Sequence, residues 1–211
     1  MRRHTALSIL AVAIFLIGAW NVQTTSQAVA DATLGKAYFA GGCFWCMEEA
    51  FENVEGVLSV TSGYMGGTVA NPSYEEVSAG RTGHAESVEV VYDPARVSYQ
   101  KLLDAFWRNV DPITPNAQFC DHGSQYRSAI FFQTDEEKRA SDISKQAIEQ
   151  SKRFKEPIVT QIVMASQFYP AEEYHQDFYK KNPVRYHAYR AGCGRDARLK
   201  EIWGEPAGGH K

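Results

Sequence analysis

The sequence has no long basic run and no acidic tail, and its formal net charge at pH 7 is only −3. Proteins that bind nucleic acid through its phosphates carry a basic patch or stripe. The balanced charge therefore argues against a nucleic-acid partner, although it does not identify another one. Internal repeats are also absent from the sequence, which excludes a repeat architecture.

Apolar runs of transmembrane length are lacking too. Residues 6–20 form the longest apolar segment, which is shorter than the roughly 20 residues that a spanning helix needs. This segment follows Arg2 and Arg3 and precedes Ala28-Val29-Ala30, the layout of a secretory signal peptide. We expect cleavage after Ala30 and export, in a bacterium to the periplasm. An uncleaved, tilted membrane anchor is the alternative.

Residues 31–211 then remain, enough for one core and too few for two ordinary domains, so we expect a single domain. Cysteine is scarce, with four residues in the chain. In an exported protein four cysteines commonly form two structural disulfides, but a domain of this size folds without them. A chemical role for some of the cysteines is therefore favoured.

The segment Gly41-Gly42-Cys43-Phe44-Trp45-Cys46 is the most informative part of the sequence. An apolar strand is predicted over residues 36–40, and apolar residues recur at helical spacing after the glycines. Cys43 is thus placed at a helix start, where free N–H groups and the helix dipole lower a thiol pKa below about 8.5. We expect a reactive thiolate. The plainer interpretation is a small buried core residue.

The first half of the chain predicts the order strand, helix, strand, strand, helix, strand. This βαββαβ order is typical of the ferredoxin-like plait, and we expect an α+β fold, an α/β sandwich with added C-terminal elements. The strands are predicted near residues 36–40, 57–62, 84–92 and 126–132, and the helices begin at Cys43 and Ser98.

Further elements follow in the second half. A capping box at residues 134–137 predicts a helix with Ala140, Ile143, Ala147 and Ile148 on its apolar side. A strand over residues 158–164 and a short helix from Pro170 to before Asn182 are also expected. Long loops at residues 63–83 and 111–125 are predicted to be functional, as loops of this length usually are.

Alternation along residues 84–92 distinguishes two glutamates. Glu86 shares its face with Val88, Val90 and Tyr92, whereas Glu89 lies on the other face. A carboxyl group at the rim of an apolar face has a raised pKa and holds a proton near neutrality. Glu86 is therefore a candidate general acid, with an ordinary strand-end glutamate as the alternative. The same parity places Tyr126 with Ile130 and Phe132, toward that site.

No role is assigned to His84, His122 or His175, because each fits a loop or helix surface. A zinc site would require Cys43, Cys46, Cys120 and His122. Only one residue separates Cys120 from His122, whereas about two to four residues usually separate a pair of zinc ligands. This signal is therefore weak, and no metal is expected.

A set of motifs in fixed order resembles the peptide methionine sulfoxide reductases of the A type. The motifs span roughly residues 36–180 and are Gly42-Cys43-Phe44-Trp45, Gly63-Tyr64-Met65-Gly66-Gly67, Asn71-Pro72-Ser73-Tyr74, Gly83-His84-Ala85-Glu86 and Asp121-His122-Gly123-Ser124-Gln125-Tyr126-Arg127-Ser128. Such a set is far more specific than any single motif.

The resemblance implies a function and a set of site residues. Cys43 would be the nucleophile and Glu86 the acid, with Tyr74, Tyr126 and Asp121 completing the polar site. Cys43 attacks the sulfoxide sulfur while Glu86 protonates the oxygen, and the substrate methyl group rests against Phe44 and Trp45. The S epimer is reduced, and Cys43 becomes a sulfenic acid that a second thiol converts to a disulfide.

The identity of the second thiol is left open by the sequence. Many members have Gly where this chain has Cys46, so Cys46 is one candidate, although helix geometry constrains its reach. Cys193, between glycines in a C-terminal segment that we expect to be flexible, is slightly favoured. Cys120 is a third candidate and more in keeping with a structural role.

The resemblance implies no metal or organic cofactor, only an external thioredoxin-like dithiol reductant. The expected substrate is methionine sulfoxide, free or in proteins damaged by oxidative stress, and the expected state is a monomer. One competing hypothesis is a periplasmic thiol–disulfide oxidoreductase that uses Cys43 and Cys46 as a dithiol. Another is a zinc-stapled binding module.

Overall fold

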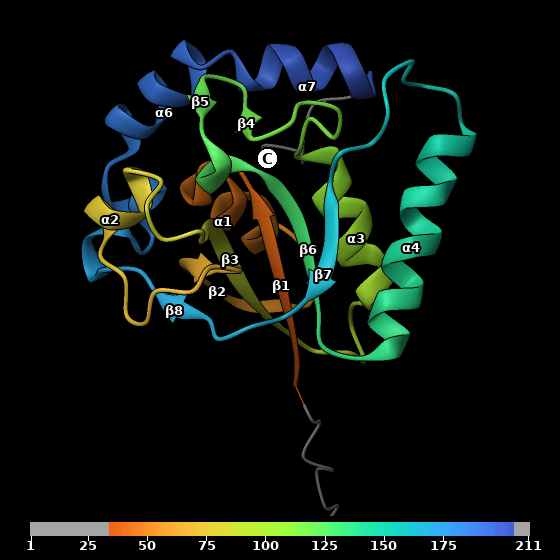
Figure 1. The fold of residues 1–211 in the computed structure, drawn as a ribbon, viewed down its shortest axis with the longest axis horizontal. Coiled ribbons are helices and arrows are strands. Elements are labelled where there is room, and N and C mark those ends of the chain that lie inside the picture. Colours follow the sequence, from red (N-terminus) through yellow and green to blue (C-terminus); the bar gives the residue numbers. More distant parts are fainter. Residues whose placement is uncertain (1–33, 205–211) are drawn as a thin grey trace, which may run out of the picture. The chain divides into compact units, whose positions relative to one another are not determined.

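A six-stranded mixed sheet forms the centre of the protein (Figure 1). The structure, a computed structural model, describes residues 34–204, so the predicted signal peptide and its cleavage site lie outside the described residues. The strand order is β7-β6-β1-β3-β2-β8. The strands are β1 (Gly35–Gly41), β2 (Val57–Met65), β3 (Ala85–Tyr92), β6 (Ser128–Phe132), β7 (Gln161–Met164) and β8 (Tyr169–Pro170).

The four inner strands confirm the predicted plait. Strands β6, β1, β3 and β2 are neighbours in that order and all pair antiparallel. Helix α1 (Phe44–Glu52) joins β1 to β2, and β3 lies between these two strands, so the unit is a split βαβ. Beyond the plait, β7 pairs parallel with β6, and β8 pairs antiparallel with β2.

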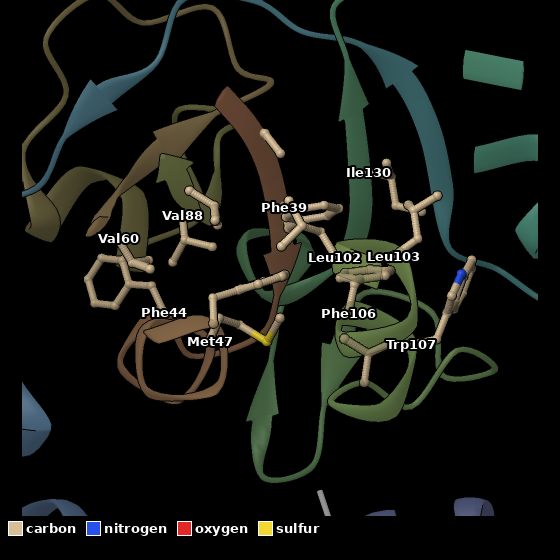
Figure 2. Packing of buried hydrophobic residues seen from close by; sticks show 14 of the residues in the cluster. Phe39, Phe44, Met47, Val60, Val88, Leu102, Leu103, Phe106, Trp107 and Ile130 are labelled. Atoms are coloured by element: carbon tan, nitrogen blue, oxygen red, sulfur yellow. The ribbon is translucent and has the colours of Figure 1, made fainter. Parts of the chain in front are cut away.

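The main core lies between one face of this sheet and helices α1 and α3 (Tyr99–Arg108), as Figure 2 shows. The Phe39 ring from β1 stacks on Phe51 of α1 and Phe106 of α3, with ring centroids 4.8 and 5.3 Å apart. Helix α3 begins directly after Ser98, in agreement with the predicted helix start, and the Ser98 side chain caps it by accepting a hydrogen bond from the Lys101 N–H. The packing of α1 and α3 on this face of the sheet fixes the position of the N-terminus of α1.

Helix α4 (Asp135–Gln150) confirms part of the predicted apolar side, because Ala140 and Ile148 pack against the core, but the buried face also includes serines. Ile143 is 60% exposed, whereas Ser141 and Ser144 are buried. Ser144 accepts a hydrogen bond from the Trp107 indole N–H at 3.0 Å, and Ser141 is bonded to the Tyr99 hydroxyl. The helix thus packs on the polar edges of α3 aromatic rings, which hydroxyls suit better than isoleucine.

The capping box predicted at the start of α4 is only half formed. The Thr134 hydroxyl accepts from the Glu137 N–H, but the Glu137 carboxylate accepts from the Gln133 N–H instead of from residue 134.

The two predicted loops contain short elements. The first is shorter than expected, because β2 continues to Met65, and it holds α2 (Tyr74–Ser78), which a complete Ser73–Glu76 capping box opens. The second holds β4 (Ala117–Gln118), β5 (Asp121–His122) and the 3-10 turn η1 (Ser124–Tyr126). The last strand of the plait therefore starts at Ser128, and the prediction of a strand from Tyr126 was wrong.

The C-terminal region contains more helix than the sequence predicted. In place of one helix from Pro170 there are β8, the 3-10 turn η2 (Glu173–His175) and α5 (Phe178–Lys181). Helices α6 (Pro183–Gly192) and α7 (Arg195–Trp203) follow and run along one side of the view in Figure 1. Within residues 34–204, no helix is both long and apolar enough to cross a bilayer.

Candidate active site

Cys43 lies at the turn between β1 and α1, as predicted. Cys43 is the N-cap residue of α1 and is 5% exposed. Gly42 precedes it with φ +80°, and a Cβ there would lie 2.5 Å from Cβ of Gln118. Because only glycine adopts this conformation easily and fits this space, Gly42 allows β1 to turn sharply into the helix.

A cavity of about 210 Å³ opens beside Cys43. It brings together every residue that the sequence analysis placed in the catalytic site or its apolar wall. Arg185 and Tyr189 of α6 also line it, and neither was predicted. The complete lining is Cys43, Phe44, Trp45, Tyr74, Glu86, Asp121, Tyr126, Arg185 and Tyr189.

Glu86 points from β3 toward the start of α1, on the helix-covered face of the sheet with Val88 and Val90. Its Oε2 accepts a hydrogen bond of 3.0 Å from the Phe44 N–H. Burial raises the pKa of Glu86 to about 8, and the Phe44 N–H offsets this only in part. Glu86 is therefore protonated at neutral pH and able to donate a proton into the cavity. Glu89 lies on the other face and bonds to Lys36 and Tyr38.

The raised pKa of Glu86 predicts a pH-dependent loss of stability. Between the pKa of the unfolded carboxyl and about 8, the folded state holds one more proton at this site than the unfolded state, so stability falls as pH rises. Glu86→Gln removes this dependence. Between about pH 5.5 and pH 7.5 we expect the parent to lose on the order of 2 kcal/mol more unfolding free energy than the variant in urea titrations. Equal losses of unfolding free energy in the parent and in Glu86→Gln would contradict the protonation assigned to Glu86.

Cys43 and Cys46 are both free thiols and both buried, one helical turn apart, and the Cys46 N–H donates to the Cys43 carbonyl at 3.2 Å. Burial raises the pKa of Cys43 well above its usual value, and the neighbouring Cys46 and Glu86 raise it further. This direction is opposite to the one expected from the helix N-terminus. The neighbouring Cys43 thiol lowers the pKa of Cys46 to about 6 against the opposing effect of burial, and the charges of Arg195 and Arg190 also lower it.

The other two cysteines are joined in a disulfide, Cys120–Cys193. Cys193 directly follows α6, and its N–H donates to the Tyr189 carbonyl at 2.9 Å. It is therefore tied to the loop of Cys120 and is not in the flexible segment that we expected. The zinc set considered from the sequence is not assembled either, because Cys120 is bonded to Cys193.

The apolar wall of the cavity is held by residues from the C-terminal region. The Trp45 ring stacks on Phe178 at 3.8 Å between centroids, with 9° between planes. Its indole N–H donates to Nδ1 of His175 at 3.1 Å, so His175 has a positioning role that the sequence did not indicate.

The three tyrosine hydroxyls of the cavity come from three different elements, α2, η1 and α6. Tyr74 starts α2, and its N–H donates to Glu172 at 2.8 Å. Burial raises the pKa of Tyr74 to about 12 and raises that of Tyr126 as well, so both remain proton donors. The Tyr189 hydroxyl donates to Asp121 of β5. Tyr126 reaches the site from the turn η1, although the strand parity used to predict this was wrong.

The plait and the cavity together define a thiol-dependent oxidoreductase. A buried thiol lies in the same small cavity as a protonated carboxyl group, with tyrosine hydroxyls and an aromatic wall around them. This set suits attack on a polar, uncharged substrate whose leaving oxygen needs a proton.

The chain belongs to the peptide methionine sulfoxide reductase family, whose model matches residues 35–207. It is 49% identical over 175 residues to the peptide methionine sulfoxide reductase MsrA of Halalkalibacterium halodurans, covering 83% of this chain and 99% of that protein. The Bacillus subtilis MsrA is 50% identical over 168 residues, or 80% and 95% of the two chains. The protein is thus an A-type reductase of methionine sulfoxide.

Solved structures agree with this assignment. Mxr1 from Saccharomyces cerevisiae in reduced form has a TM-score of 0.68 at 32% identity, covering 72% of this chain and 88% of that one. Methionine sulfoxide reductase A of Corynebacterium diphtheriae has a TM-score of 0.66 at 33% identity, covering 72% and 76%. The expectation of a mixed α+β fold of this family is confirmed.

Proposed function

We propose that the protein reduces the S epimer of methionine sulfoxide, free or in oxidised proteins, through a sulfenic acid on Cys43. The observation that carries this is the protonated Glu86 in the cavity beside the Cys43 thiol. Glu86 protonates the sulfoxide oxygen while the Cys43 sulfur attacks the substrate sulfur. The oxygen then moves from the substrate sulfur to the Cys43 sulfur, so that the substrate S–O bond and the transient S–S bond both break, methionine leaves, and Cys43 carries the oxygen as a sulfenic acid. The proton given up by the Cys43 thiol restores Glu86.

The neighbouring groups have separate tasks in this step. Tyr74 and Tyr126 hold the oxygen, and Asp121 orients Tyr189 at the cavity wall. Phe44 and Trp45 receive the methyl group and exclude water. No metal or organic cofactor takes part.

Cys46 is the thiol that resolves the sulfenic acid. It is a free, buried thiol one helical turn from Cys43, with its N–H bonded to the Cys43 carbonyl, whereas Cys193 is already bonded to Cys120. The resulting Cys43–Cys46 disulfide is then reduced by an external thioredoxin-like dithiol. A related protein, Mxr1 of Saccharomyces cerevisiae, has been solved in complex with Trx2.

The test is an epimer-resolved assay with a small dithiol as reductant. The S-sulfoxide of N-acetylmethionine amide should be converted and the R-sulfoxide should not. After one turnover without reductant, peptide mass spectrometry should find Cys43 joined to Cys46. Equal use of both epimers would contradict the proposed stereochemistry, and a link from Cys43 to Cys193 would contradict the proposed resolving thiol.

We also propose that the protein is exported as residues 31–211, a single monomeric domain, after cleavage behind Ala30. The layout of residues 1–30 supports this. N-terminal sequencing of the protein recovered from the cell envelope tests it, since a start at Met1 would indicate an anchor. A reductant of the exported enzyme would then act outside the cytoplasm, where no glutathione pool keeps thiols reduced.

A further inference from the structure

Arg195, the first residue of α7, is a buried cation that forms no ion pair within the described residues. It is 2% exposed. Its Nη2 donates to the carbonyls of Asn109 at 2.6 Å and Gly41 at 3.2 Å, and its Nε has no hydrogen-bond partner. A buried guanidinium without a carboxylate is costly unless another negative charge lies nearby.

The guanidinium lies over the Phe119 ring, with its Cζ 4.5 Å from the ring centroid, and its charge also acts on Asp121. Its contacts with the turn that carries Cys43 and Cys46 point to the cysteine pair as a further negative charge beside it. Its guanidinium contacts the β1–α1 turn: Nη1 is 3.7 Å from the position of a Cβ on Gly42, and Nη2 is 3.3 Å from the Met47 sulfur. These two residues flank the Cys43–Cys46 segment. The charge of Arg195 lowers the pKa of Cys46 more than that of any other cation does.

The second cation near Cys46 is already neutralised. Arg190 of α6 is paired with Glu49 at 3.3 Å and with Asp196 at 2.6 Å. Of the two arginines whose charge lowers the pKa of Cys46, Arg195 is therefore the one without an ion pair among residues 34–204, although its charge also acts on Asp121. The other titratable groups around the cysteine pair come from five elements, and they are Glu86 of β3, Asp121 of β5, Tyr74 of α2, Tyr126 of η1, and Arg185, Tyr186 and Tyr189 of α6. Glu86 is protonated at neutral pH, and the tyrosines supply hydrogen bonds.

We infer that Arg195 is the counter-ion of a thiolate on Cys46 and, through it, a positioning residue for closure of the Cys43–Cys46 disulfide. Only the role in disulfide closure rests on the proposed function. The role as counter-ion does not. The buried pair then shares one proton, which Cys43 donates toward the Cys46 sulfur. Cys46 needs no base before it attacks.

The closure step balances with this assignment. The Cys46 thiolate attacks the Cys43 sulfur of the sulfenic acid, an S–S bond forms and the S–O bond breaks. The leaving hydroxide takes one proton, which protonated Glu86 supplies, and departs as water. No oxidant or metal is needed. Glu86 then recovers its proton from solvent, and the external dithiol later returns two electrons and two protons to the disulfide.

The first arm of the experiment measures ionisation without any sulfoxide. In a Cys43→Ser background, Cys46 is the one free thiol in the protein, and its far-ultraviolet thiolate absorbance is titrated against pH. We expect a transition near the lowered pKa in this parent and an upward shift of at least about two pH units in Arg195→Met. Arg195→Lys should retain most of the low value, because the charge is kept.

Arg198→Met is the matched control. Arg198 lies on the same helix and pairs with Asp111 and Glu201, so its loss should leave the transition in place. Equal transitions in Arg195→Met, Arg198→Met and the parent would overturn the inference. If the Arg195 variants do not fold, titration of the otherwise unaltered chain decides the question, since absence of any thiolate below about pH 8 also overturns it.

The second arm tests the effect on catalysis. After one turnover on the S-sulfoxide, dimedone should trap the Cys43 sulfenic acid at least about tenfold more in Arg195→Met than in the unaltered enzyme. Equal trapping in Arg195→Met and in the unaltered enzyme would show that Arg195 has no role in disulfide closure. A failure of the proposed function appears as lack of methionine formation in every variant, and the thiolate titration is unaffected by it.

Discussion

Replacing Cys43 with serine is expected to reduce methionine formation by on the order of 10⁴-fold or more. A serine hydroxyl is far less acidic and less nucleophilic toward sulfur than a thiol, and it cannot form a sulfenic acid. The substitution is close to isosteric at a residue that is 5% exposed, so the fold should be retained. The measurement is chromatographic quantification of methionine from its S-sulfoxide with a dithiol reductant, beside thermal unfolding of both proteins.

Two control variants separate the nucleophile from the other cysteines. Cys46→Ser should release one equivalent of methionine in a first turnover and then stall with a thioredoxin-like reductant. The double variant Cys120→Ser, Cys193→Ser, which removes the disulfide, should still carry out the first turnover. Turnover by Cys43→Ser at the rate of the parent would show that the chemistry takes place elsewhere.

The sequence was sufficient for the plait because its local signals agree with its tertiary packing. Each of β1, α1, β3 and α3 has a clear apolar period and a turn or cap at its end. In helix α4 the orientation of Ile143 was wrongly predicted, because the serines beside it face inward and contact polar atoms of Trp107 and Tyr99. Hydropathy alone cannot signal a buried serine that satisfies an indole N–H.

The site was predictable where a short-range pattern carried the information. A glycine turn located Cys43, and two-residue alternation separated Glu86 from Glu89. The direction of the Cys43 pKa was not predictable, because burial and the thiol of Cys46 outweigh the helix N-terminus there. Arg195 is equally hidden in the sequence, since it reaches the site only through contacts across more than 80 residues of chain.

Glu86→Gln is expected to slow sulfoxide reduction by on the order of 10³-fold. Glutamine has nearly the same shape and its carbonyl oxygen still accepts the Phe44 N–H bond, so the cavity should be preserved. What is lost is the proton that the sulfoxide oxygen requires as the S–O bond breaks. The first-turnover rate of methionine formation, measured by rapid quenching, reports this step without interference from the reductant.

The matched control for this variant is Glu89→Gln, three residues away on the same strand. Glu89 faces away from the helices and bonds to Lys36 and Tyr38, so its replacement should leave the first turnover within about twofold of the parent. A loss of similar size in both variants would indicate damage to β3, not removal of an acid.

The pH profile separates an acid from a residue that merely shapes the cavity. Because burial raises the pKa of Glu86 to about 8, the proton is present below that pH and lost above it. The first-turnover rate of the parent should therefore fall on the alkaline side with a midpoint near this value. Glu86→Gln should be slow throughout and lack this fall, because its amide does not titrate. A fall of the same shape in the glutamine variant would assign the ionisation to the cysteine pair and leave the sulfoxide oxygen without its proposed proton donor.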